Sequence, residues 1–339
     1  MENNQIKIKD YYLRIGSIIL AFLFVTLMIF LAGASPTEVF VALWQGISNP
    51  DQFARVLLTL APLLLCTSGL VFTFMVGLYN LGIEGEMIVG AIATTFALRI
   101  FQDMIPGYLA ILLGMTFGIF GGAFWGLFAG VLNVYGKVNE IFAGLGLNFV
   151  AQGLTLYLVF GPWKRPGVAS MSGTEQFKES VWLPTIGNTE FSPIALILAV
   201  LGLVLTVIVI RGTYFGLQLR AVGQNLRASY ILGIPAYRRL LGAFAICGAF
   251  GGIAGALQVL AVFHRLIPNI SSNLGFLALL IGMLVGDGIL WILPVAFFFS
   301  ALNVGSLQLP LSLQLESSLA GVIQGTLVLF VLLARAFNK

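Results

Sequence analysis

The sequence predicts an all-α membrane protein, a polytopic helix bundle with about ten transmembrane helices. Of its 339 residues, 59% are hydrophobic and only 9% are charged, and the mean hydropathy is +1.02. Soluble domains carry about 25% charged residues, so this composition excludes a soluble enzyme. The apolar residues also gather into long runs separated by short polar segments, which is the pattern of a chain that crosses a membrane repeatedly.

Ten apolar runs are candidates for membrane helices. A helix that spans the bilayer core needs about 20 predominantly apolar residues, and three of the ten runs are shorter than that. The first run is longer than the core of a secretion signal, so we expect an uncleaved first span. The ten runs cover residues 15–34, 55–77, 86–101, 108–132, 140–160, 193–210, 240–262, 272–286, 289–304 and 318–336.

The distribution of basic residues predicts the orientation of the chain. The segment 211–239 holds five arginines and no Asp or Glu, and Lys/Arg bias places short loops on the cytoplasmic side. Alternating the sides from this loop puts both termini in the cytoplasm and makes 161–192 the largest external loop. We therefore expect a single transmembrane domain over residues 1–339, with residues 1–14 as a cytoplasmic N-terminus.

Several function classes are excluded by composition. The net charge of +4 is small and lies in loops, so it reports topology and not nucleic-acid binding. Cys66 and Cys247 lie in apolar runs and His264 is the single histidine, so neither a disulfide framework nor a metal site is predicted. The chain has no G-x-x-x-x-G-K-[ST] phosphate loop. We expect no cofactor and no enzymatic activity.

A short helix is predicted inside the basic loop. Asn225 is suited to cap the N-terminus of a helix over Leu226–Leu232, and Gly233 suits the left-handed position after its last turn. Such a helix places Ala228 and Ser229 with Leu232 on one side, where small residues would let another protein approach. By composition alone, the arginines of this loop could serve only to fix topology and contact lipid headgroups.

The second apolar run ends in an unusual way. It meets Gly77 and then a polar stretch from Asn80 to Glu86, without a charged loop. Two interpretations stay open: a helix break buried beside a translocation path, or a plain cytoplasmic turn. Glu84 and Glu86 are two residues apart, so on a helix they face different ways. Because no His or Ser partner accompanies them, catalysis is not predicted.

Two of the predicted helices carry ladders of small residues. Residues four apart on a helix form a slowly drifting stripe, and small residues on such a stripe let two membrane helices pack closely. We therefore expect these ladders to be packing surfaces. The residues are Gly114, Gly118, Gly122, Gly126 and Gly130 in one helix, and Gly248, Gly251, Gly252, Gly255 and Ala256 in the other.

The predicted helix 140–160 carries two amides among aromatic residues. Asn148 and Gln152 are four apart and are expected on one face, with Phe142 and Phe149 flanking them. Uncharged amides in a bilayer usually face the protein interior. They either bond neighbouring helices or line a path for a polar solute, and the sequence leaves both alternatives open.

Two stretches resemble a known family. Arg220–Pro235, R-A-V-G-Q-N-L-R-A-S-Y-I-L-G-I-P, resembles the cytoplasmic coupling motif of ABC-transporter permeases of the ribose, nucleoside and branched-chain amino-acid importer type. Tyr79–Met87, Y-N-L-G-I-E-G-E-M, resembles their N-L-G-I-E-G-Q-M signature, nearest the nucleoside and sugar branch. Glu86 stands where many relatives have Gln. The motifs occur in the family order, and the likeness in length and hydropathy covers nearly the whole chain.

The resemblance implies a permease subunit of an ABC importer in the bacterial cytoplasmic (inner) membrane. Its implied solute is small and polar, a nucleoside, with a ribose-like sugar as the alternative. The implied partners are a cytoplasmic ATP-binding subunit that binds the ATP, a second permease subunit (identical or not), and an extracellular or periplasmic solute-binding protein. The residues assigned to coupling with the ATPase are Arg220, Gly223, Asn225, Ala228, Gly233 and Ile234. The residues assigned to the solute path are Asn80, Glu84, Asn148 and Gln152.

Two other classes of protein are weighed against this one. A secondary transporter or channel would need no ATPase and should show ionisable residues in its spans for ion coupling; only Glu84 and Glu316 suggest this. An intramembrane enzyme would need a Ser/His or paired-Asp constellation in the spans, and the sequence shows none.

Overall fold

The structure is a computed structural model, and every regular element of its described residues is helical. Each of the ten predicted runs coincides with a helix. Of the residues discussed above, the segment 1–14 and Glu316 lie outside the described residues. The structure describes residues 16, 19–31, 33–165, 167, 173–187, 189–286, 288–315 and 318–336.

Six helices of the described residues are long and apolar enough to cross a membrane. A further helix, Ile19–Leu31, is followed after a bend of 99° by α2 (Pro36–Ser48), and this pair could together form a seventh span. The apolar helices Leu274–Val285 and Ser318–Leu333 are shorter than a typical span. The six long segments are Pro50–Met75, Gly107–Val134, Glu140–Phe160, Pro193–Gly212, Ala236–Phe263 and Ile289–Leu313.

The described residues pack as two compact units. Unit 1 combines the residues up to Val56 with those from Leu280 onward, and unit 2 is Leu57–Leu279. The boundaries fall inside two continuous helices, α3 (Pro50–Met75) and α11 (Leu274–Val285). The interior of α3 also contains a proline, Pro62.

Unit 1 is built around α2. This helix packs against α12 (Ile292–Gly305) and α13 (Leu309–Leu313), and α12 in turn contacts α14 (Ser318–Ala336). The approach of α2 to α12 is close because both contribute glycine: a methyl carbon at Gly46 would lie 2.7 Å from the Cα of Gly305. The buried core beside this contact consists of Ile29, Val39, Ala42 and Leu309.

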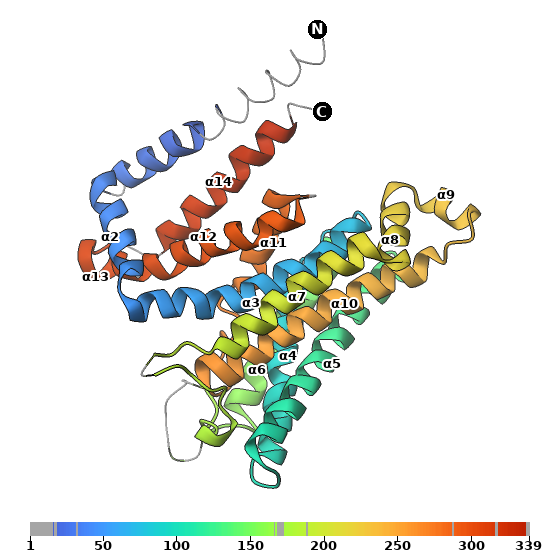
Figure 1. Cartoon of the computed structure of the whole chain (residues 1–339), viewed down its shortest axis with the longest axis horizontal. Coiled ribbons are helices and arrows are strands. Elements are labelled where there is room, and N and C mark those ends of the chain that lie inside the picture. The colour runs from blue at the N-terminus through green and yellow to red at the C-terminus, as the bar shows by residue number, and fades with distance from the viewer. Residues whose placement is uncertain are drawn as a thin grey trace. The chain divides into compact units, whose positions relative to one another are not determined.

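Unit 2 contains most of the long helices. In Figure 1, α4, α5 and α10 run side by side, and these three helices share the most extensive contacts in the chain. Helix α6 covers α4, and α7 packs on α3 through a hydrogen bond from Thr206 Oγ1 to the Ser68 carbonyl oxygen, 3.5 Å long. The helices not yet bounded are α4 (Ile83–Phe101), α5 (Gly107–Val134), α6 (Glu140–Phe160), α7 (Pro193–Gly212) and α10 (Ala236–Leu257).

The glycine ladders join α5 to α10, as predicted. A methyl carbon at Gly122 would overlap the Gly248 carbonyl oxygen and lie 2.6 Å from the Cα of Gly252. Gly252 in turn faces the carbonyl of Gly118, and its own Cα lies against Gly90 of α4. Three helix backbones therefore meet at one level, which only residues without a side chain permit.

The end of α10 is irregular. The helix continues as a π-helix over Gln258–Phe263 and stops at His264, which has a left-handed φ of 54°. The predicted external loop is fastened here: Phe177 N donates to the His264 carbonyl oxygen and Leu183 N donates to the Leu260 carbonyl oxygen, each at 2.9 Å. The Trp182 ring stacks on the His264 imidazole, with 3.9 Å between ring centroids. These contacts hold residues 177–183 against the end of α10, where the segment forms a cap.

The cap is expected to weaken at low pH. Burial lowers the pKa of His264, against the opposing effects of the Leu260 backbone and Glu190, so the packed state favours the neutral imidazole. Because the unpacked histidine protonates first, near its ordinary pKa of about 6.5, stability is lost as the pH falls through that value. Hydrogen exchange measures the effect: protection of the Phe177 amide should fall between about pH 8 and about pH 5. His264→Phe keeps an aromatic ring without titration and should abolish the pH dependence; the same dependence in that variant would contradict the assignment.

The basic loop and the predicted external loop lie at opposite ends of unit 2. Figure 1 shows α8 (Tyr214–Gln224) and α9 (Leu226–Ile231) at one end of the α7–α10 pair, and the described part of 161–192 at the other. This separation agrees with the predicted placement of the two loops on opposite sides of the membrane.

Candidate functional site

The connection between α3 and α4 is a helix break buried inside unit 2. Helix α3 ends at Met75, Gly77 adopts a left-handed φ of 78°, and α4 begins at Ile83. Asn80 and Glu86 are fully buried. The stretch from Asn80 to Glu86 is therefore largely buried, as the first of the two interpretations expects, whereas Gly77 and Tyr79 before it are exposed.

The break reaches the middle of the bundle. A methyl carbon at Gly251 would lie 3.1 Å from Glu86 Cβ, and Gly251 is close to the midpoint of the 28-residue span Ala236–Phe263. The beginning of α4 therefore lies near half depth along that span. Irregular backbone at such depth is tolerated only inside protein or beside a water-filled cavity.

A polar network holds the break together. Asn80 Nδ2 donates to Glu86 Oε1 at 2.8 Å and lies 3.2 Å from Cys247 Sγ, while Asn80 Oδ1 accepts from Gly82 N at 3.0 Å. Glu86 Oε2 is buried without a hydrogen-bond partner among the described residues. Cys66 and Cys247 are free and buried, as expected.

The network predicts different outcomes for two changes at Glu86. Glu86→Gln keeps an oxygen acceptor for the Asn80 amide and should change the free energy of unfolding by less than about 1 kcal/mol. Glu86→Leu leaves the buried Asn80 amide unpaired and should cost about 1–3 kcal/mol. Thermal unfolding of the detergent-solubilised protein compares them, and equal destabilisation by both changes would contradict this role.

The side-chain amide of Asn148 joins helix α6 to the break. Asn148 Oδ1 accepts from Gly85 N and Asn148 Nδ2 donates to the Leu81 carbonyl oxygen, both at 2.8 Å. The prediction that Gln152 shares this face was wrong, because Gln152 is exposed. Four residues advance a helix by about 40° more than a full turn, which carries Gln152 past the buried edge to the side where Phe149 is 78% exposed.

Glu84 faces a different element from Glu86, as expected from their spacing. Its Oε2 accepts a hydrogen bond of 3.3 Å from Phe276 N, at the beginning of α11. Three of the four predicted path residues, Asn80, Glu84 and Asn148, therefore surround the break, and Gln152 stands apart on the exposed face of α6.

The short helix in the basic loop is present with the predicted ends. Asn225 Oδ1 accepts from Ala228 N at 3.0 Å and caps α9, and Gly233 has a left-handed φ of 78°. The helix ends at Ile231, one residue early. One expectation was wrong: Ser229 is buried against the protein, whereas Ala228 is exposed. Adjacent residues of an α-helix point about 100° apart, so these two do not share one side.

Helix α8, which precedes α9, was missed from the sequence. Its beginning carries a signal, since Thr213 Oγ1 caps it by accepting from Gly216 N at 3.2 Å. Helix α8 packs on the end of α3, where a methyl carbon at Gly223 would overlap the Met75 carbonyl oxygen. Arg220 donates to the Ile210 carbonyl oxygen at 3.1 Å and so ties α8 to α7.

The tip of α9 exposes apolar side chains that the sequence reasoning did not single out. Tyr230, Ile231 and Leu232 are 70%, 84% and 77% exposed. Ile234 N donates to the Ser229 carbonyl oxygen at 3.0 Å, which fixes the chain after the tip. Three consecutive large apolar residues inside an otherwise polar loop were the available signal, because such an exposed cluster is typical of a protein-binding surface.

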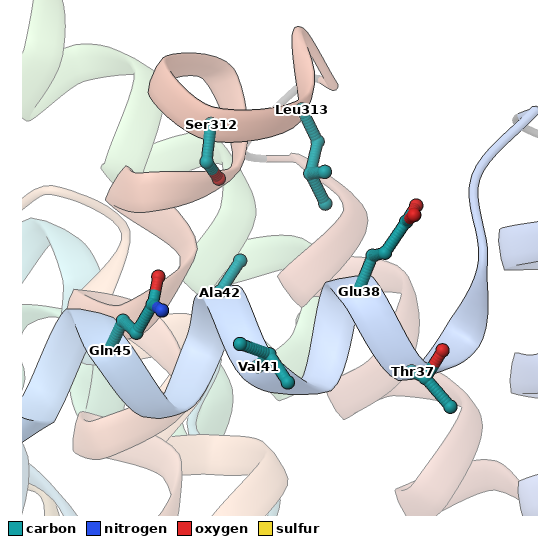
Figure 2. Close-up of a pocket in the computed structure, with 7 residues that line it drawn as sticks. All are labelled: Thr37, Glu38, Val41, Ala42, Gln45, Ser312 and Leu313. Atoms are coloured by element: carbon teal, nitrogen blue, oxygen red, sulfur yellow. The ribbon is translucent and has the colours of Figure 1, made fainter.

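Unit 1 contains an open pocket of about 280 Å³. Figure 2 shows it between α2 and the short helix α13, and none of the predicted site residues contributes to it. Its polar groups are few and do not converge as in a specific small-molecule site. The lining residues are Thr37, Glu38, Val41, Ala42, Gln45, Ser312 and Leu313.

Long apolar helices, a helix break buried inside unit 2 and a basic segment between α7 and α10 are the features expected of a transport permease. Residues 52–332 match the family described as "Branched-chain amino acid transport system / permease component", so the chain belongs to this family of ABC-transporter permeases.

Curated relatives agree with the family match. The chain is 26% identical over 312 residues to the guanosine ABC transporter permease protein NupP of Bacillus subtilis, covering 90% of this chain and 88% of that one. It is 26% identical to the nucleoside ABC transporter permease protein NupB of Lactococcus lactis, covering 77% and 74%. It is 27% identical to the glucose ABC transporter permease protein TsgB13 of Haloferax volcanii, covering 87% and 80%.

The family assignment fixes the class of function. The chain is the membrane-embedded permease component of an ABC importer and an integral, multi-pass protein of the cytoplasmic membrane. It is not the catalytic subunit, because ATP hydrolysis belongs to a partner chain.

Proposed function

We propose that this chain forms part of the translocation path for a nucleoside. Relatives that cover most of the chain are named for guanosine and nucleoside transport. Helix α6 exposes the uncharged amide of Gln152 and the ring of Phe149, a mixture that suits hydroxyls and base edges. The observation that carries the proposal is the Asn80–Glu86 and Asn148–Gly85 network at half depth in the bundle. A sugar is the second candidate, because another relative is named for glucose.

The proposed topology has ten membrane crossings and both termini in the cytoplasm. Besides the six long spans, the first helix, α4, α11 and α14 complete the count. Nearly all of the first four turns of α4 are buried, so protein and not lipid surrounds Glu84 and Glu86. Arg99 lies exposed in the last turn of this helix. The whole chain then forms one transmembrane permease domain.

Three partners complete the transporter. A cytoplasmic subunit binds ATP and docks on α8 and α9, where Arg220, Gly223, Asn225, Ala228, Gly233 and Ile234 form or support the contact. A second permease subunit completes the path, and a solute-binding protein docks on the external loop 161–192. Closure of the ATPase moves α9 and shifts the equilibrium between inward-facing and outward-facing states, because nucleotide binds the two states with different affinity.

The four path residues have two roles in this proposal. Asn80, Glu84 and Asn148 fix the shape of the wall. Asn80 and Asn148 hydrogen-bond within the break, and Glu84 joins the beginning of α4 to the backbone of α11. Gln152 presents a free-standing amide on the exposed face of α6, where it meets the solute.

Reconstitution tests the function. The permease and its partner subunits, purified together and placed in proteoliposomes with the cognate solute-binding protein, should take up radiolabelled nucleoside only when ATP is supplied. Uptake that persists without the ATPase or nucleotide would overturn the importer mechanism in favour of a secondary transporter. Competition by unlabelled guanosine, ribose and glucose identifies the solute class, and displacement by glucose alone would favour the sugar.

A further inference from the structure

Two helices of unit 2 begin at the same buried place. Helix α4 begins at Ile83 after the break, and α11 begins at Leu274 after a turn that follows the π-helix. A methyl carbon at Gly275 would lie 2.5 Å from Glu84 Oε2 and 2.8 Å from Glu84 Cα. The two helix N-termini are therefore in direct backbone contact near half depth of the bundle.

This meeting brings together backbone N–H groups that need hydrogen-bond acceptors. Each helix N-terminus carries unpaired N–H groups and a partial positive charge, so two of them repel each other. Glu84 supplies the compensating oxygen atoms: its Oε2 accepts from Phe276 N at 3.3 Å, and Ser271 and the backbone of Asn273 and Gly275 also hydrogen-bond to this side chain. The acceptor for the N–H groups at the beginning of α11 is therefore a side chain of the protein itself.

The turn before α11 has an unfavourable backbone. Ser272 and Asn273 are consecutive non-glycine residues with φ of 51° and 59°, a conformation that costs each of them energy and persists only where surrounding contacts impose it. Both residues are exposed, while Ser271 before them is buried. Exposed polar groups on irregular backbone at this depth belong beside a water-filled path and not against lipid.

We propose that Glu84 anchors this turn and that Asn273 contacts the transported solute. The Asn273 amide offers two donors and an acceptor, which fits a neutral solute with hydroxyl and base-edge groups. Glu84 acts only through position, because its carboxylate is occupied by the N-terminus of α11. This inference rests on the proposed function and extends it to a solute-binding residue outside the recognised motifs.

Hydrogen exchange tests the anchor without any transport. Glu84→Gln can replace the acceptor oxygen facing Phe276 N with an amide nitrogen that only donates. It should accelerate exchange of the amides at 273–276 at least about tenfold, while Glu86→Gln, the matched control two residues away, should leave them unchanged. Gly275→Ala pushes against the same carboxylate and gives the same acceleration if Glu84→Gln does not accumulate. Unchanged exchange in the Glu84 and Gly275 variants would overturn the anchor.

Uptake kinetics test the contact. In proteoliposomes with the full set of partners, Asn273→Ala should raise the KM for nucleoside about tenfold with little change in maximal rate, and Glu84→Gln should mainly lower the maximal rate. An unchanged KM for Asn273→Ala would overturn the solute contact. If wild-type protein shows no ATP-dependent nucleoside uptake, the proposed function fails and the solute contact with it, whereas the exchange result still decides the anchor.

Discussion

Gly252→Ala is expected to lower the free energy of unfolding by about 2–3 kcal/mol. The added methyl group would overlap the Gly118 carbonyl oxygen of α5. Because that atom belongs to a helix backbone, the collision cannot be relieved by turning a side chain, and α10 must move away from α5. Thermal unfolding of the detergent-solubilised permease measures the loss.

Gly153→Ala is the matched control for this change. Gly153 lies in the interior of α6, and a methyl group there would meet nothing within 4 Å. Alanine has a higher helix propensity than glycine by about 0.8–1 kcal/mol, so the control should be neutral or slightly stabilising. Equal unfolding temperatures for the two variants would show that the α5–α10 contact is looser than described.

Gly223→Trp is expected to abolish ATP-driven uptake while the membrane bundle stays folded. A side chain at Gly223 would strike the Met75 carbonyl oxygen, so an indole ring must lift α8 away from the end of α3. The proposed docking surface on α9 then loses its position relative to the bundle. Uptake by proteoliposomes, together with the amount of ATPase that co-purifies, measures the effect.

Gly212→Trp is the control that separates the effect of a large side chain in the loop from the effect of displacing α8. Gly212 ends α7, and a methyl group there meets nothing within 4 Å, so Gly212→Trp adds the same side chain to the same loop without displacing α8. It should transport at close to the wild-type rate. Normal uptake by Gly223→Trp would remove α8 from the coupling route.

Local patterns were enough to predict most of the helices and several of their ends. Hydropathy located ten runs that are helical but missed α2 and the short helix α13. The capping chemistry of Asn225 and Gly233 predicted the limits of α9 to within one residue. These features depend on neighbours in sequence, which is why they can be read from it. The glycine ladders were also readable, since a four-residue spacing defines one face of a helix.

Features that depend on distant partners were not predictable. The exposure of Gln152 follows from how far α6 is rotated against α4, and the contact of Glu84 joins residues 192 positions apart. Helix α8 was overlooked because its mixed composition gives no apolar run, and tertiary contacts at Gly223 stabilise it. In each case the structure depends on a contact with residues that are distant in the sequence.

The absence of a flexible linker at either unit boundary has a mechanical consequence. The chain passes between the units within α3 and within α11, both of which continue through the boundary. A rotation of one unit would have to bend these two helices. Pro62 lies in α3 only six residues past Val56 and removes one backbone hydrogen bond from that helix. We therefore expect α3 to bend most easily at Pro62. Any change in the relative position of the two units would then have to strain α3 and α11 themselves, because no loop joins the units at these two boundaries.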